Sequence, residues 1–376
     1  MLNLPSNLKI MKHTFLSVLT FFLLFSFSVF GQEDDDVEMV VADGVEIDSS
    51  GIDPEAQEFY NQGISALESN NSSGAIEFFT QALELSPEFA QAYNNRAFAH
   101  IDNGDLEKAK SDFKNAASLN EELHNPYFQM GVIAEQQDSL EAALKYYSMA
   151  IERFSTDETY HYQKGLTQFK VGEYESAVDD FTGAISLKKD YADALNDRGS
   201  AYKMLDNLDN AILDYKAATL HNPKLSLAFA NLGTAYREKE EYTNAVSAYT
   251  KALNSDPDNH LALNNRGYAH FLNEDYDNAI KDFEKVIKKN PDYAQALNNL
   301  ASVYIKKEDY EKAEEYASKA ISKNEDLGQA YCNRGIAREM LRKEKEACED
   351  WSKASSLGIN LGESYYHSSS CSTLFD

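Results

Sequence analysis

Several residue types are scarce in this chain of 376 residues, and each scarcity narrows what it can do. There are 35 Lys and Arg against 62 Asp and Glu, so the formal charge is −27. A surface of that sign repels phosphate backbones and anionic lipid headgroups. The 8 His show no paired metal-ligand spacing, and no Gly-rich phosphate loop or nucleophile elbow occurs. We therefore expect no nucleic-acid binding, no cofactor, no metal and no catalytic residue, which means that the chain is not an enzyme.

Cysteine is rare as well, with 3 residues in the chain. None lies just after the apolar run near the N-terminus, which argues against a bacterial lipoprotein signal. Three cysteines permit one intramolecular disulfide at most, with three possible pairings.

A long apolar run occurs once, over residues 14–30, just after the basic residues Lys9 and Lys12. At about 17 residues it is shorter than the ~20 that a membrane-spanning helix needs. Small or modest residues stand at the −3 and −1 positions before Gln32. We therefore predict a signal peptide at 1–31, with an uncleaved anchor as the alternative.

Cleavage at that point implies an exported protein, periplasmic or associated with a bacterial cell envelope, without a membrane span in the mature chain. Met1 and Met11 are both possible starts of the segment. Residues 32–53 hold nine Asp or Glu and no Lys or Arg. We expect 32–55 to be an acidic disordered linker, and a tail that binds divalent cations is the alternative.

The rest of the chain is dominated by a 34-residue unit repeated nine times, without insertion or deletion, over residues 56–361. Position eight of each unit is Gly or Ala, and position twenty is always Ala. The aromatic residues at position twenty-four are Phe79, Phe113, Tyr147, Phe181, Tyr215, Tyr249, Phe283 and Trp351. The units run over 56–89, 90–123, 124–157, 158–191, 192–225, 226–259, 260–293, 294–327 and 328–361.

Small residues at positions eight and twenty allow two helices to approach closely, and the aromatic at twenty-four continues the buried stripe of the second helix. Polar residues between them break the first helix and cap the second. Each unit is therefore predicted to form a helix–turn–helix, with helix A first and helix B second.

This period and these columns resemble the tetratricopeptide repeat family. The resemblance implies an all-α, right-handed superhelical solenoid of nine helix–turn–helix repeats, closed by a C-terminal capping helix within 362–376. It also implies a non-enzymatic scaffold or adaptor that binds an extended peptide or a partner protein in a concave groove lined by helix A. A structural assembly factor that uses the convex face or the solenoid ends is the alternative. The last unit and the cysteine near the end resemble exported members from Bacteroidota-type bacteria.

Charges at positions seven and twenty-three occur together or not at all, which predicts ion pairs between helices A and B. The predicted pairs are Arg96–Asp112, Lys164–Asp180, Arg198–Asp214, Arg266–Asp282 and Arg334–Asp350. We interpret them as fixing the fold, because each cation already has a partner; a basic clamp that holds a ligand is the alternative.

Position six carries a carboxamide in eight units and Asp in one. By the resemblance, this column looks into the inner groove and is similar to the asparagine ladder that some members use to hold extended peptides. The alternative is that the amides bond the neighbouring helix. The column is Asn61, Asn95, Gln129, Gln163, Asp197, Asn231, Asn265, Asn299 and Asn333.

A disulfide between Cys348 and Cys371 is favoured among the three pairings. Export leads to an oxidising space, where cysteines pair. Cys348 stands one residue past the small contact at Ala347, on the side of helix B expected to face the cap, and Cys371 falls at position ten of what would be a tenth unit. Cys332 is at position five, pointing away. Three free thiols remain the alternative.

Overall fold

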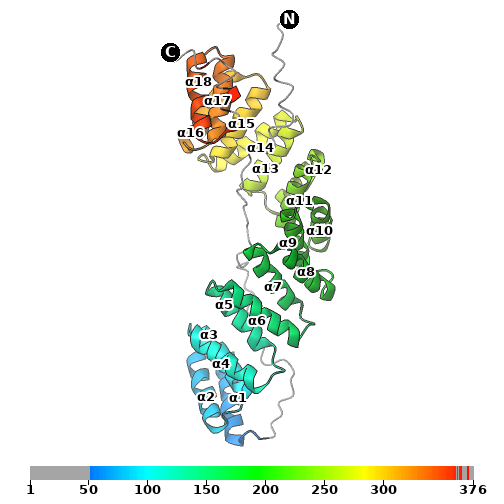
Figure 1. Cartoon of the computed structure of the whole chain (residues 1–376), viewed down its shortest axis with the longest axis vertical. Helices are drawn as coiled ribbons and strands as arrows, with labels where there is room; N and C mark the ends of the chain where they lie inside the picture. The colour runs from blue at the N-terminus through cyan, green and yellow to red at the C-terminus, as the bar shows by residue number, and fades with distance from the viewer. Residues whose placement is uncertain (1–50, 361, 363, 366–370, 372–376) are drawn as a thin grey trace. The chain divides into compact units, whose positions relative to one another are not determined.

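The computed structural model of the chain describes residues 51–360 together with 362, 364, 365 and 371 (Figure 1). The predicted signal peptide at 1–31 and most of the predicted linker at 32–55 lie outside the described residues. Most of the predicted cap at 362–376 does so too, although Gly362, Ser364 and Tyr365 are helical.

The described residues form 18 α-helices and no strand, two helices for each 34-residue unit, so the predicted all-α fold is confirmed. Between residues 51 and 360, no helix is both long and apolar enough to cross a bilayer. The helices are α1 (Pro54–Glu68), α2 (Ser72–Leu85), α3 (Ala90–Asp102), α4 (Leu106–Leu119), α5 (Asn125–Gln136), α6 (Leu140–Arg153), α7 (Glu158–Val171), α8 (Tyr174–Leu187), α9 (Ala192–Met204), α10 (Leu208–His221), α11 (Ser226–Glu238), α12 (Tyr242–Ser255), α13 (His260–Leu272), α14 (Tyr276–Lys289), α15 (Ala294–Lys306), α16 (Tyr310–Lys323), α17 (Gly328–Met340) and α18 (Glu344–Ser356).

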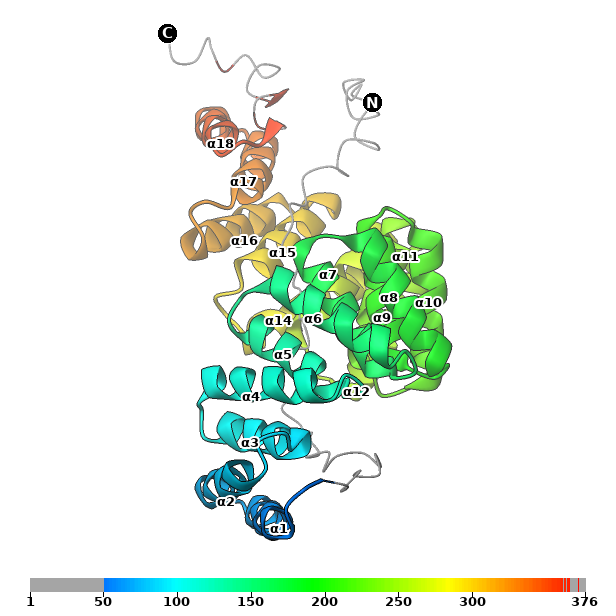
Figure 2. The same ribbon diagram turned by 60° about the horizontal axis from the view of Figure 1, so that its bottom comes forward.

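The described residues form two compact units, which we call the N-terminal unit and the C-terminal unit, and the division lies inside α11, between Ala235 and Tyr236. Within each unit, a helix A packs against the helix B that follows it, and that helix B packs against the next helix A. Figures 1 and 2 show this side-by-side order for α1–α4 in one unit and for α15–α18 in the other.

Inside each helix pair, the small residues at positions eight and twenty lie at the same close contact as the aromatic residue at position twenty-four. Ala at position twenty is fully buried in all nine repeats, and the eight aromatic rings at position twenty-four are at most 1% exposed. A Cβ added to Gly165 would lie 2.8 Å from the Phe181 ring, and one added to Gly267 would lie 2.8 Å from the Phe283 ring. Position eight is therefore kept small by the ring that helix B presses against it.

The turn between helices A and B uses the left-handed backbone region at position fifteen of every repeat. Gly104 and Gly172 have φ of +81° and +87° there, and the next residue's N–H bonds a carbonyl of helix A, as in Glu173 to Gln168 at 2.9 Å. The other seven repeats place a larger residue in this region, at φ of 54–63°: Asn70, Asp138, Asp206, Glu240, Glu274, Glu308 and Arg342. The same turn geometry therefore recurs in all nine repeats, at a backbone cost in seven of them.

Candidate functional site

The structure brings together the residues of all five ion pairs expected from the sequence. Each aspartate side chain is nearly buried, at 4–11% exposure, and each cation is about a fifth exposed. The nitrogen–oxygen distances are 2.7 Å for Arg96–Asp112, 3.1 Å for Lys164–Asp180, 2.7 Å for Arg198–Asp214, 2.7 Å for Arg266–Asp282 and 2.6 Å for Arg334–Asp350. Burial makes these pairs structural, because removing one partner leaves an uncompensated charge at a cost of ~3–5 kcal/mol.

Three of the arginines also bind the preceding repeat. Nη1 donates to the threonine hydroxyl at position twenty-five of that repeat's helix B: Arg96 to Thr80 at 3.1 Å, Arg198 to Thr182 at 3.0 Å and Arg266 to Thr250 at 3.2 Å. The pKa of Arg198 lies above its usual value, chiefly because Asp214 accepts its hydrogen bonds. Each of these guanidinium groups therefore bonds helix A both to the helix B of its own repeat and to the helix B of the preceding repeat. Their hydrogen bonds are made within the protein.

A larger charge network closes the C-terminal unit. Asp350 accepts hydrogen bonds from Arg334 and from Nη1 of Arg338, the latter at 2.8 Å. Arg338 also donates to Glu314 at 3.0 Å, and Lys343 donates to the same carboxylate at 2.6 Å. Burial alone would raise the pKa of Glu314, but Lys343 and Arg338 beside it bring the pKa below the usual value. The network ties α16, α17 and α18 together.

Four of the amides at position six bond the helix A of the preceding repeat. In each case Nδ2 donates to a side chain at position five, 35 residues earlier: Asn95 to Tyr60 at 2.8 Å, Asn231 to Asn196 at 3.0 Å, Asn299 to Asn264 at 3.1 Å and Asn333 to Asn298 at 2.9 Å. Three of the donors, Asn95, Asn299 and Asn333, are buried. For these residues the structure favours the neighbouring-helix role over the peptide-binding role, because each amide donates a hydrogen bond to the preceding helix A.

The remaining members of the column differ from one another. Asn61 is exposed and accepts from Gln57 at 3.1 Å, while Gln163 donates to Glu135 at 3.0 Å. Gln129 and Asn265 are half-buried. The column therefore does not present one uniform ladder of amides to a ligand.

Asp197 is the one acid of the column. Its carboxylate accepts from the Tyr162 hydroxyl at 2.8 Å and from the Asn196 amide at 3.0 Å, and so repeats the inter-helix bond with the donor reversed. Burial raises the pKa of Asp197 to about 6, although the hydrogen bonds from Tyr162 and Asn196 oppose the shift. Below that pH the side chain is neutral, like the amides elsewhere in the column.

Beside the amides, helix A presents half-buried apolar side chains at position nine or twelve in several repeats, although position twelve is charged in four of the nine. These positions lie three apart and share a helix face with positions five and six. In the C-terminal unit, Tyr268 stacks on Phe271 with ring centroids 5.9 Å apart, and the Arg237 guanidinium lies 5.7 Å from the Tyr268 centroid. Ile305 and Ile336 continue the set on α15 and α17.

The N-terminal unit carries the same kind of residue at position nine, with Ile64, Val132 and Leu166 half-buried and Phe98 buried. Sequence reasoning did not predict that position nine forms an apolar surface. The sequence did contain a sign of this surface, because position nine is apolar in six of the nine units. We call the half-buried apolar side chains at positions nine and twelve the helix-A face.

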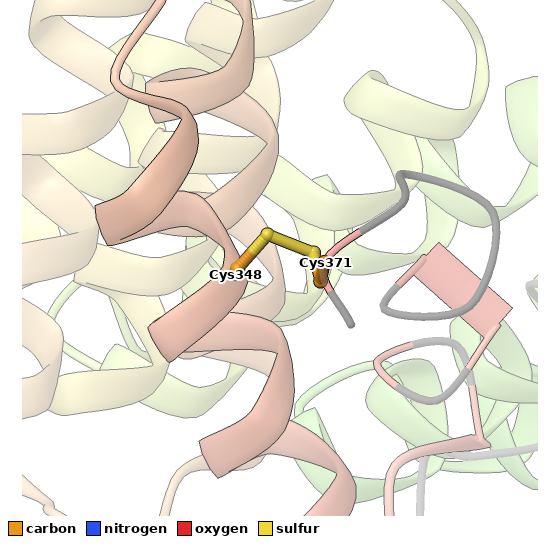
Figure 3. Close-up of a disulfide and its surroundings, with 2 residues drawn as sticks. All are labelled: Cys348 and Cys371. Atoms are coloured by element: carbon orange, nitrogen blue, oxygen red, sulfur yellow. A yellow bond between two sulfur atoms is a disulfide. The ribbon is translucent and has the colours of Figure 1, made fainter. Parts of the chain in front are cut away.

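The C-terminal end is held by the pair of cysteines that the sequence favours (Figure 3). Cys348 on α18 is bonded to Cys371, with the Cα atoms 5.5 Å apart. Cys332 is buried, and burial raises the pKa of its thiol to about 12, so that it stays protonated and unreactive. Trp351 stacks on Tyr365, with the ring centroids 5.2 Å apart. Tyr365 therefore lies against α18, where a further helix A would pack.

Models of repeat families match much of the repeat region. The models described as Tetratricopeptide repeat match residues 78–111, 162–223, 260–293 and 283–315, and the one described as TPR repeat matches 233–274. The matched stretches lie in both units, and every one falls inside the nine-fold array.

Several known proteins resemble parts of the chain. It is 33% identical over 112 residues to Tetratricopeptide repeat protein 36 of Mus musculus, which is 27% of this chain and 60% of that protein. It is 41% identical over 63 residues to Protein FlbA of Caulobacter vibrioides, which is 16% of this chain and 11% of that protein. The chain thus spans less than two thirds of the length of these curated relatives.

Among solved structures, the C-terminal part of a TPR repeat-containing protein from Cytophaga hutchinsonii aligns with a TM-score of 0.56 and 17% identity, over 64% of this chain and 99% of that one. At that identity the likeness shows the fold alone. The helix pairs, the solenoid likeness and the matching models together strongly support membership of the tetratricopeptide repeat family, whose members generally mediate protein–protein interactions and are typically non-enzymatic scaffolds.

Proposed function

We propose that this protein is a scaffold that binds an extended peptide or a segment of a partner protein on the helix-A face. The observation that carries the proposal is the row of half-buried apolar and aromatic side chains on successive helices A, above all Tyr268, Phe271, Ile305 and Ile336. Half-buried aromatic and aliphatic groups on a rigid helix can desolvate a ligand side chain at low entropic cost.

The amides of position six have a supporting part in this proposal. Because Asn299 and Asn333 hold neighbouring helices A together, they fix the spacing at which the apolar side chains are presented. Recognition then depends on apolar anchors, and the negative charge of the chain favours a basic or neutral partner over an acidic one.

Crosslinking tests where the partner binds. A photoreactive residue at Ile305, on the helix-A face, should crosslink the partner, whereas one at the exposed Lys281 of α14 should not. Crosslinks from Lys281 alone would favour an assembly factor that works through helix B.

Affinity provides a second test with a matched control. Ile305→Gln should weaken binding of the crosslinked partner without changing the fold, because the side chain is only half-buried. Ile287→Gln changes another half-buried isoleucine, which lies on helix B, and should leave binding unchanged. Equal losses for both variants would contradict the proposed surface.

We also propose that the chain is exported to the periplasm or the cell envelope of a bacterium. The apolar run at 14–30 behind Lys9 and Lys12 supports this proposal. Fractionation followed by sequencing of the N-terminus should find a mature chain that begins at Gln32. An intact N-terminus in the cytoplasmic fraction would contradict it.

A further inference from the structure

Two carboxylates of the N-terminal unit are held by neutral donors. Glu135 on α5 accepts hydrogen bonds from the Tyr147 hydroxyl and from the Gln163 amide, each at 3.0 Å. Asp197 on α9 accepts from the Tyr162 hydroxyl at 2.8 Å and from one amide of its own helix at 3.0 Å. In the described part of the chain neither acid forms an ion pair, whereas each of the five aspartates at position twenty-three does. Both acids are half-buried, so a group of a partner can reach them.

Helix α7 lies between these two acids. Its adjacent residues Tyr162 and Gln163 bond the acids on opposite sides, Asp197 on α9 and Glu135 on α5. Leu166 lies one turn further along the same face of α7 and is half-buried. Because packed helices are ~8–10 Å apart, α5 and α9 are about 16–20 Å apart. The surface has an apolar centre with a negative charge on each side, and we call Glu135, Leu166 and Asp197 the α5–α9 surface.

The cations of these helices do not neutralise the two acids. Lys164 on α7 and Arg198 on α9 are paired with the aspartates at position twenty-three of their own repeats. Lys170 and Lys203 lie at least six residues beyond position six of their helices. Over residues 51–235 there are 29 Asp and Glu against 14 Lys and Arg, whereas residues 236–360 have 23 against 19. The N-terminal unit therefore attracts a cationic segment more strongly than the C-terminal unit does.

We propose that the α5–α9 surface binds a basic, extended segment of the partner, with one Lys or Arg at Glu135, another at Asp197 and an apolar side chain at Leu166. This inference rests on the proposed function and specifies the chemistry of the partner. Each carboxylate accepts two hydrogen bonds and has lone pairs left for a third donor. A cation there makes a charge-assisted hydrogen bond and compensates a half-buried charge.

The distance between the acids sets the spacing of the cations. An extended chain advances ~3.3–3.6 Å per residue, so it passes from α5 to α9 in about five or six residues. The probe is a labelled nine-residue peptide of Gly and Ser, with Leu at its centre and one Lys three residues to each side. Fluorescence polarisation with the full chain should show binding that weakens when the salt concentration rises from about 0.05 M to about 0.5 M. The same peptide with Glu in place of both Lys should bind at least tenfold more weakly.

Charge-neutral variants test the two acids. Glu135→Gln with Asp197→Asn keeps an acceptor at each position and should weaken binding of the lysine peptide by about tenfold or more. Glu77→Gln with Glu84→Gln removes the same number of charges from exposed sites on α2 and should leave binding unchanged. Titrations at pH 8, above the pKa of about 6 to which burial raises Asp197, keep its carboxylate ionised. If circular dichroism shows that the first double variant is unfolded, Glu135→Gln and Asp197→Asn are measured singly, and each should weaken binding several-fold.

The outcomes separate this inference from the proposed function. Equal binding of the lysine and glutamate peptides, or equal losses for the two double variants, would overturn the basic segment. If the partner nevertheless crosslinks from Ile305, the proposed function stands without it. Binding of the lysine peptide that is lost only with Glu135 and Asp197 supports the α5–α9 surface.

Discussion

Gly165→Ala should destabilise the protein, although alanine is the better helix former. The new Cβ would lie 2.8 Å from the Phe181 ring, which is fully buried and cannot move aside. Overpacking of this kind costs about 1–3 kcal/mol, whereas the gain in helix propensity is about 1 kcal/mol. We therefore expect a net loss of about 1 kcal/mol. Repeat two accommodates Ala97 beside the buried Phe113, which indicates that the cost does not exceed that range.

A double-mutant cycle separates these two effects. Phe181→Ala alone should cost about 3–5 kcal/mol through the cavity that it leaves. In that background Gly165→Ala should stabilise by about 1 kcal/mol, because the clash is gone and repeat eight already combines Ala301 with Ala317. The coupling energy is then about 2 kcal/mol.

Urea unfolding, read by circular dichroism and by hydrogen exchange in α7 and α8, measures the cycle. Hydrogen exchange is needed because a repeat array can unfold in parts. Additive effects, with a coupling energy below about 0.5 kcal/mol, would refute the steric account of positions eight and twenty-four.

Three further predictions address the turn, the amide column and the buried acid. Gly172→Ala should destabilise the protein by about 1 kcal/mol, because a Cβ strains the backbone at a φ of +87°. The added Cβ would touch no other atom, so a loss of melting temperature would measure the backbone strain alone. Asn333→Ala should cost about 1–3 kcal/mol by leaving buried Asn298 without its donor, whereas Asn61→Ala at an exposed site should change the free energy of unfolding by less than about 0.5 kcal/mol. Burial raises the pKa of Asp197 to about 6, so folding favours its protonated form and a penalty develops as pH rises from about 4 to above 6. Asp197→Asn should therefore be the more stable protein at pH 8 and lose that advantage at pH 4, which denaturant titrations at the two pH values will measure.

The helix pairs could be predicted because their contacts lie within one repeat. Position eight meets position twenty-four sixteen residues later, so the constraint recurs along the chain at a fixed spacing, as with Gly165 and Phe181. The five ion pairs follow the same logic, since Arg198 and Asp214 are also sixteen residues apart. The strained turn was harder to predict from the sequence, because Gly stands at position fifteen in only two repeats. In the other seven, the backbone geometry imposes a positive φ on larger residues such as Glu274.

The candidate site depended more on the tertiary structure. A column of amides is compatible with a ligand and with a neighbouring helix, and only packing distinguishes the two. The Asn333–Asn298 bond joins consecutive helices A and buries both side chains, so those amides are used before any ligand arrives. The row of apolar residues at position nine was in the sequence, but its half-burial was not.

The sequence by itself determined the period, the helix pairs and the partners within each repeat, because those contacts are local and recur nine times. Only the tertiary structure decided which polar side chains make hydrogen bonds between repeats. It also decided which apolar side chains stay exposed, as Leu213 and Leu220 do on α10. The physical reason is that exposure depends on what the adjacent helices cover, and a side chain's own position in a repeat does not report that coverage.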